Sequence, residues 1–317
     1  MSLPSIKQKS TMEITTISLS SIVSNPENYS EGENVFGEYI HQGDLALIIG
    51  DTNSGKTLLA CDIALANNDN LCYWEEPMTN RKRKAIYIDG EHNDSQIARR
   101  YENLLECSSG DLIRGRFTED DYDSCIEDRL SAIENLLRSN NDTELLIIDN
   151  LMCMLDNGKS AKQAQQFIQG LKQIKEQYDL TIILVAHLSK RNSKNPIEVR
   201  DILGSSVIAN YADSIIAVGN SCEGDNIKYL KQLKSRSSIK ISEVAVMEIA
   251  EEPYLHFDFR YFDNEENHLP KKKVSRNSIS PLMGNTVLRL KNEGLTVRGI
   301  AEQLGLSKSA VGRFLKN

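Results

Sequence analysis

The chain has 317 residues, of which 40% are hydrophobic and 26% are charged, so it can form one large globular domain and a small one. No apolar run approaches the roughly 20 residues that a membrane-spanning helix needs, and the N-terminus lacks a secretory signal pattern. The six cysteines are scattered without a C-x-x-C pair, which indicates neither a zinc site nor a disulfide framework. We therefore expect a cytoplasmic protein without membrane contact.

The net charge of −8 is unevenly distributed along the chain. Residues 271–317 carry ten Lys/Arg and only two Asp/Glu, so an acidic body ends in a basic segment. A basic tail can be an ordinary solvated surface. The contrast with the acidic body favours an anionic partner for the tail alone.

Residues 1–30 are polar and rich in Ser and Thr, and they are predicted to form a short N-terminal leader. Beyond them, short apolar runs alternate with amphipathic stretches. The runs have the composition of strands buried on both faces of a parallel sheet. They are "DLALIIG" (44–50), "KAIYIDG" (84–90), "ELLIIDN" (144–150), "TIILVAH" (181–187) and "SIIAVGN" (214–220). Helices are predicted between them at 56–65, 95–105, 125–138 and 161–177.

The alternation predicts an α/β fold over residues 31–263, a mostly parallel sheet flanked by helices. Three further runs, "NIKYLKQL", "SEVAVMEIA" and "LHFDFRYF", are expected to close this domain as antiparallel strands. Residues 264–281 then read as a polar, basic linker. A small all-α module is predicted at 282–317.

The stretch "GDTNSGKT" fits the phosphate-loop pattern G-x-x-x-x-G-K-[ST] between a predicted strand and a predicted helix. Gly50 and Gly55 let the backbone curl, so that successive N–H groups face a phosphate. Lys56 would reach the β- and γ-phosphates of ATP, and the Thr57 hydroxyl would bind Mg²⁺. A simple turn is the alternative, which the strand–helix context disfavours. The predicted nucleotide-binding residues are Gly50, Asp51, Thr52, Asn53, Ser54, Gly55, Lys56, Thr57 and Leu58.

A second metal ligand is predicted at Asp149, at the end of the buried run "ELLIIDN". The alternative is a strand-terminal Asp that caps a turn. Asn150 follows where many P-loop ATPases carry a catalytic Glu, and an amide cannot act as a base. Glu91, in "AIYIDGEHND", follows another strand at the ligand-binding edge and is the predicted base. Asp89 lies nearby, within the strand end.

These stretches resemble RecA-like ATPases, and within them the plasmid RepA and DnaB-type hexameric helicases, over about residues 35–262. The resemblance implies a catalytic Glu91 and a polar sensor at His187 of "TIILVAHLSK". In the same group, "DILGSSVIANYADSIIAV" matches a segment in which Gly-Ser precedes a helix. The resemblance also implies that Lys234 and Arg236 of "LKQLKSRSS" are a K-x-R pair that reaches the ATP site of a neighbouring subunit. A satisfied strand-end histidine and a basic hairpin turn are the alternatives. A ring, with a hexamer expected, or a filament would follow.

The C-terminal sequence "NTVLRLKNEGLTVRGIAEQLGLSKSAVGRFLKN" predicts three short helices, with Gly305 in a turn and Ser307 as an N-cap. It resembles the helix-turn-helix of resolvases and transposases, which implies that residues 307–316 bind the major groove of duplex DNA. A three-helix interaction module is the alternative. The predicted DNA contacts are Ser307, Lys308, Ser309, Arg313 and Lys316.

Together these features predict a Mg²⁺-dependent ATP-hydrolysing motor that acts on DNA, as a helicase or a replication or mobilisation ATPase of a mobile element. Two loops, "LSKRNSKNPIEVRD" and "MLDNGKSAKQ", are candidates to line a channel for single-stranded DNA, or are ordinary solvated loops. Two other classes remain open. One is an ATP-dependent DNA-binding regulator or recruiter without unwinding activity, and the other is a KaiC-like signalling ATPase.

Overall fold

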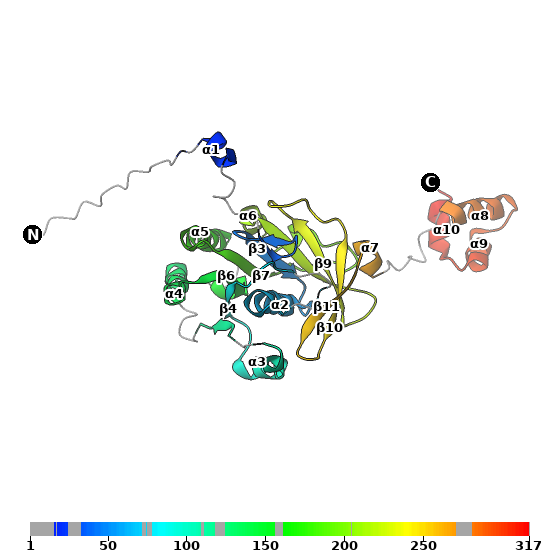
Figure 1. The fold of residues 1–317 in the computed structure, drawn as a ribbon. Coiled ribbons are helices and arrows are strands. Elements are labelled where there is room, and N and C mark those ends of the chain that lie inside the picture. Colours follow the sequence, from blue (N-terminus) through cyan, green and yellow to red (C-terminus); the bar gives the residue numbers. More distant parts are fainter. Residues whose placement is uncertain are drawn as a thin grey trace, which may run out of the picture.

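A large, mostly parallel sheet organises the chain, and helices cover both of its faces (Figure 1). In the described residues its strand order is β11-β10-β9-β8-β3-β7-β6-β4-β5. Strands β3 to β8 pair in parallel, whereas β8 to β11 pair with one another in antiparallel fashion. A computed structural model of the chain describes residues 16, 18–24, 33–71, 74, 78–108, 111–117, 124–155, 161–203, 205–270 and 281–316.

The strands of the sheet are β3 (Leu45–Gly50), β4 (Lys84–Asp89), β5 (Ile113–Gly115), β6 (Thr143–Asp149), β7 (Thr181–His187), β8 (Ser214–Asn220), β9 (Ile227–Lys234), β10 (Val244–Ala250) and β11 (His256–Asp263). A separate antiparallel pair is formed by β1 (Asn34–Phe36) and β2 (Ile40–His41). The main helices are α2 (Lys56–Asp69), α3 (Asp94–Arg100), α4 (Ile126–Ser139), α5 (Ala161–Tyr178) and α6 (Ser205–Tyr211). Shorter helical elements are α1 (Leu19–Ser24), α7 (Glu265–His268), η2 (Leu104–Glu106), η4 (Leu151–Met154) and η6 (Val199–Asp201).

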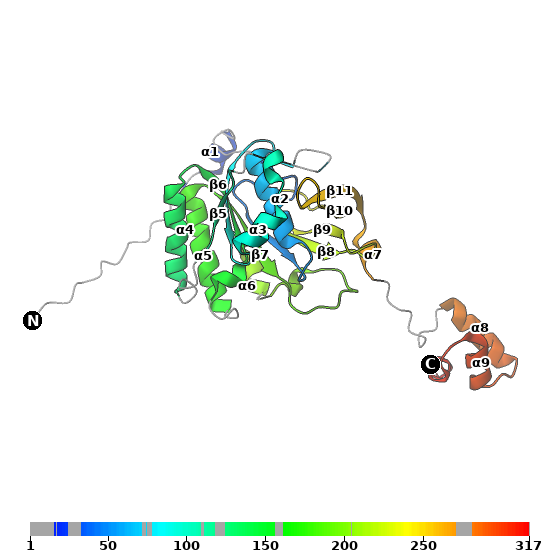
Figure 2. The same ribbon diagram turned by 90° about the horizontal axis from the view of Figure 1, so that it is seen from below.

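The central strands are buried on both faces, which is why their sequences are almost wholly apolar. In β3, Leu45 and Leu47 point into the cluster that contains Phe167 of α5, whereas Ile48 points into the cluster that contains Leu59 of α2. Figures 1 and 2 show the result, with α4 and α5 side by side on one face and α2 on the other. Each face of the sheet therefore forms one side of a separate apolar core.

The predicted α/β fold is confirmed, and the five predicted parallel strands coincide with β3, β4, β6, β7 and β8 to within one residue at each end. The three antiparallel runs are β9, β10 and β11. The helix predicted at 95–105 is shorter: α3 ends at Arg100 and the 3₁₀ turn η2 follows. Strand β5 was not predicted, because three half-buried residues carry too weak a pattern.

The predicted linker at 264–281 requires a correction at its N-terminal end. Residues 264–270 pack on the sheet, where Glu265 of α7 accepts a hydrogen bond from Tyr229 at 3.1 Å and pairs with Lys231. His268 is fully buried and lies 2.8 Å from the Ser221 hydroxyl. Residues 271–280, and most of the predicted leader, lie outside the described residues. Among the helices that are described, none combines the length and apolar content of a membrane span.

The C-terminal helices α8 (Pro281–Asn292), α9 (Val297–Leu304) and α10 (Lys308–Phe314) form a bundle with its own apolar core (Figure 2). That core contains Val287, Leu290, Ile300, Ala301 and Val311. The turn between α9 and α10 contains Gly305 at a positive φ of 64°, which a glycine adopts without strain. Ser307 caps α10, because its hydroxyl accepts a hydrogen bond from the N–H of Ala310 at 3.2 Å. The three predicted helices are therefore present, and the first begins at Pro281.

Candidate functional site

The loop between β3 and α2 has the geometry of an anion cradle. Gly55 has a positive φ of 95° and lies against Phe257, whose Cζ would be 2.5 Å from a Cβ at this position. A residue with a side chain would therefore clash as well as strain the backbone. Gly55 is the N-cap of α2 and offers no side-chain cap, which leaves the first N–H groups of the helix available to a phosphate.

Lys56 lies across this loop, almost wholly buried, and its Nζ donates to the backbone oxygen of Asp51 at 2.8 Å. Burial lowers the pKa of Lys56, and the carboxylates of Asp149, Glu91 and Asp51 oppose that shift. The ammonium group is thus held among carboxylates at the mouth of the loop. A phosphate that enters the loop would provide the counter-charge that this buried lysine needs.

The other predicted nucleotide-binding residues differ in their exposure and in the atoms that they could offer to a ligand. Thr52 and Asn53 are exposed, whereas the Ser54 hydroxyl is buried and has no hydrogen-bond partner among the described residues. A Cβ on Gly50 would lie 2.4 Å from that hydroxyl oxygen, so the loop closes tightly on its own first residue. The side chain of Leu58 belongs to the apolar core, which restricts any phosphate contact of this residue to its backbone.

Asp149 and Thr57 offer oxygen atoms of the kind that Mg²⁺ binds. Asp149 is buried at the end of β6, and its Oδ2 accepts a hydrogen bond from the Tyr87 hydroxyl at 2.6 Å. Its Oδ1 makes no hydrogen bond to the described residues. Burial raises the pKa of Asp149, and the hydroxyls of Tyr87 and Thr57 oppose that shift. A magnesium ion typically takes only one or two protein oxygens and completes its shell with phosphates and water.

Glu91, Asn150 and His187 converge beside the phosphate loop. Glu91 Oε1 accepts a hydrogen bond from the Asn150 side-chain amide and lies 3.3 Å from His187 Nε2. The hydrogen bond to His187 is the main cause that lowers the pKa of Glu91, against the effect of partial burial. Glu91 is therefore a carboxylate at neutral pH, as a general base requires. Asn150 was set aside in the sequence because it cannot be a base, and its contact with Glu91 was not predicted.

Asp89 has a different environment from Glu91, although the two are separated by only one residue. Its Oδ1 accepts hydrogen bonds from the N–H groups of Glu91 and His92, both at 2.9 Å. Its Oδ2 pairs with the Arg114 guanidinium at 2.9 Å. Burial alone would raise the pKa of Asp89, but these hydrogen bonds hold it at about 2. Asp89 is occupied with fixing the loop, which leaves Glu91 as the available carboxylate.

Lys234 and Arg236 do not lie beside the phosphate loop of their own chain. Lys234 Nζ donates to the backbone oxygens of Ala209 and Ala212, at 2.8 and 2.6 Å. Arg236 pairs with Asp213 at 3.0 Å, and Asp213 also accepts from the N–H of Leu45 at the start of β3. Since the phosphate loop follows the end of β3, Arg236 is about 16 Å away along the strand direction.

The loop after His187 contacts the phosphate loop directly. Arg191 forms an ion pair with Asp51 at 3.4 Å, and only 7% of the Arg191 side chain is exposed. Residues 156–160, in the middle of the other predicted channel loop at 154–163, lie outside the described residues. In the C-terminal bundle, Lys308, Ser309, Arg313 and Lys316 are exposed, whereas Ser307 is half-buried as the cap of α10.

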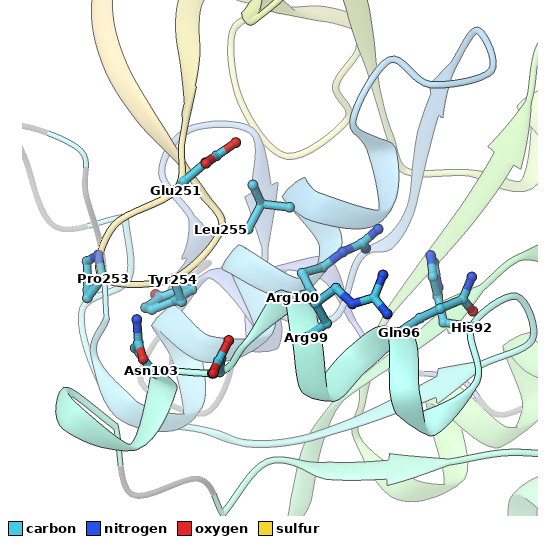
Figure 3. A pocket seen from close by; sticks show the side chains of 10 residues that line it. His92, Gln96, Arg99, Arg100, Asn103, Glu251, Pro253, Tyr254 and Leu255 are labelled. Carbon is cyan, nitrogen blue, oxygen red and sulfur yellow. The ribbon is translucent and has the colours of Figure 1, made fainter.

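A pocket of about 490 Å³ opens next to Glu91, between α3 and the turn that joins β10 to β11 (Figure 3). His92, Gln96, Arg99 and Arg100 project from the α3 side, and the facing turn contributes Glu251 and Leu255 (Figure 3). Leu255 is two residues from Phe257, which packs on Gly55 of the phosphate loop. The pocket itself is lined by the α3 segment and this turn, and not by the phosphate loop. No signal in the sequence had indicated it.

We expect Asp89→Asn to be destabilising because Asp89 has a folded pKa of about 2, below the ordinary value of about 3.9. The stabilisation from the ionised carboxylate is present above pH 4 and is lost as the pH falls toward 2. This stabilisation corresponds to about 2–3 kcal/mol. Denaturant unfolding at a series of pH values should show a deficit for the variant at pH 7 that narrows below pH 4.

The matched control for this prediction is Asp94→Asn, which removes a mostly exposed carboxylate that also pairs with Arg114. This variant should unfold nearly as the unaltered protein does. An Asp89→Asn deficit that stays constant from pH 7 to pH 3 would contradict the role assigned to the ionised carboxylate.

The family model AAA_25, described as an AAA domain, matches residues 24–193 of the chain. That range includes the phosphate loop, Glu91, Asp149 and His187. No curated protein matches the chain. The matched range covers more than half of the chain, and the fold and the phosphate-loop geometry agree with it. The chain belongs to this AAA-domain family of RecA-like P-loop proteins and is a nucleotide-dependent ATPase.

Proposed function

We propose that the protein is a Mg²⁺-dependent ATPase of the RecA type that acts on DNA and works as a ring or filament of identical subunits. The observation that carries the ATPase mechanism is the placement of one ionised carboxylate, Glu91, beside the buried Lys56 and Asp149. The DNA-directed part is supported by the exposed basic residues of the C-terminal bundle. The assembly is supported by Arg236, which is half-exposed and lies at the ends of the strands opposite to the phosphate loop.

In this mechanism each group has a separate task. The N–H groups of the phosphate loop and Lys56 bind the β- and γ-phosphates. Thr57 and Asp149 would hold Mg²⁺, which neutralises charge on the phosphates when bound. Glu91 orients the attacking water and accepts its proton, and His187 keeps the Glu91 carboxylate in its ionised form.

Glu91→Gln should bind ATP normally but hydrolyse it at least about a hundredfold more slowly, which is the scale for loss of a general base. Steady-state phosphate release would give the rate, and equilibrium binding of a non-hydrolysable ATP analogue would give the affinity. Glu106→Gln is the matched control, because Glu106 is exposed in the η2 turn. A Glu91→Gln protein that turns over ATP at the unaltered rate would place the base elsewhere.

A shared site between subunits would be tested by mixing two inactive proteins. Arg236→Ala retains Lys56 and Glu91, and Lys56→Ala retains Arg236, so a mixed interface can combine an intact phosphate loop with an intact arginine. ATPase activity should therefore exceed the linear average of the two variants after subunit exchange. Variants that co-assemble but never exceed that average would refute a trans-acting Arg236. An Arg236→Ala protein with full activity would show that the arginine serves only its ion pair with Asp213.

The C-terminal segment should supply most of the affinity for duplex DNA, because neutralising phosphates is the main source of such affinity. Replacing Lys308, Arg313 and Lys316 with Gln should weaken duplex binding and make it less dependent on salt, while ATP binding is unchanged. Deletion of residues 271–317 should have a larger effect. Duplex affinity that resists both changes, measured by fluorescence anisotropy at several salt concentrations, would refute the role of the tail.

The second candidate function is an ATP-dependent recruiter that binds duplex DNA without unwinding it. It is favoured by the C-terminal bundle, because a helix presented to a major groove binds duplex rather than single strands. Strand separation on a forked substrate supports the motor. ATP-dependent assembly on duplex DNA without strand separation supports the recruiter.

A further inference from the structure

Asn150 occupies a buried position at the centre of the catalytic cluster. It is the first residue after β6, and only 3% of it is exposed. Its Oδ1 accepts hydrogen bonds from the N–H groups of Met152 and Cys153, at 2.8 and 3.3 Å. Asn150 is thus the N-cap of the 3₁₀ turn η4.

This cap fixes which way the amide points. Backbone N–H groups can only donate, so the side-chain oxygen must face them and the Nδ2 group must face the opposite side. On that side, Nδ2 donates to Glu91 Oε1 and lies 3.3 Å from His187 Nε2. The amide therefore presents its donor to the carboxylate that would activate the attacking water.

The backbones on the two sides of this contact are also joined. The N–H of Gly90 donates to the Asp149 oxygen at 2.5 Å, one residue before Glu91 and one before Asn150. Cys153 Sγ donates to the Gly90 oxygen at 3.3 Å, and a Cβ on Gly90 would lie 2.7 Å from that sulfur. These contacts fix the η4 turn relative to the loop that contains Glu91. The Asn150 amide therefore meets the Glu91 carboxylate at one defined position.

We propose that Asn150 is a positioning residue that holds the Glu91 carboxylate in the orientation needed to activate water. This inference rests on the role of Glu91 given above. About a third of the Glu91 side chain is exposed, and its other side-chain hydrogen-bond partner within the described residues is His187. Loss of the amide would therefore release the carboxylate to further rotamers. As a neutral donor, Asn150 stabilises the anion without adding charge next to Asp149.

The test compares Asn150→Ser with Asn150→Ala. Serine is also a good N-cap, so it preserves the η4 turn, but its shorter side chain cannot reach Glu91 at the same time. Both variants should lower kcat about ten- to a hundredfold, as expected when a carboxylate loses a hydrogen bond. The Kd for a non-hydrolysable ATP analogue should change less than about twofold, because Asn150 would not contact the bound nucleotide. The serine variant should melt close to the unaltered protein, which keeps the test valid if the alanine variant does not fold.

A double-mutant cycle separates positioning from a general structural role. If Asn150 acts through Glu91, then Asn150→Ser should cause no further loss in a Glu91→Gln background. Asn93→Ser is the matched control, since Asn93 caps α3 in the same way and should leave kcat unchanged. A serine variant with the unaltered kcat, or an equal fold-loss in both backgrounds, would overturn the inference while Glu91 keeps its role. A Glu91→Gln protein that hydrolyses ATP at the unaltered rate would instead overturn the role of Glu91 in the proposed mechanism, on which this inference rests.

Discussion

The register of four parallel strands is the constraint on which the site depends. Gly50 at the end of β3 pairs with His187 at the end of β7, and Asp89 at the end of β4 pairs with Asp149 at the end of β6. A shift of one residue in any of these pairings would turn a polar side chain into the apolar core. The candidate catalytic groups therefore meet at the edge formed by the carboxyl ends of these strands, because the cores on both faces of the sheet fix the register.

The charged groups at this edge differ in how well their hydrogen bonds compensate for burial. Lys56 and Asp149 are buried with opposite charges. Lys56 Nζ donates to the backbone oxygen of Asp51, and Asp149 Oδ1 has no hydrogen-bond partner among the described residues. Such groups have a strong demand for a ligand that brings both phosphate and a cation. Asp89 is also buried, but its hydrogen bonds are complete. A loop built on a satisfied Asp89 can thus hold Glu91 in place while the unsatisfied groups bind the substrate.

The two edges of the sheet are chemically different. The edge at the carboxyl ends of the parallel strands contains the phosphate loop and its carboxylates. At the opposite edge, Lys234 and Arg236 donate to backbone oxygens at the end of α6, and Arg236 also pairs with Asp213. An arginine at the opposite edge cannot assist its own phosphate loop, but in a head-to-tail assembly it can face the loop of the next subunit. This difference between the two edges is the physical argument for the assembly proposed above.

The sequence by itself determined the phosphate-loop motif and the alternation of strands and helices, and it predicted Asp149 as a metal ligand. These features depend on local patterns: glycines where the backbone must curl, and apolar runs where strands are buried on both faces. It also predicted Glu91 as the base, although Asp89 is acidic as well and only two positions away. The tertiary structure supplies the physical reason, because hydrogen bonds from Arg114 and two backbone N–H groups occupy Asp89. The sequence could not reveal the role proposed for Asn150 either. That role depends on a partner 59 residues away in the chain and on a cap that fixes the amide orientation.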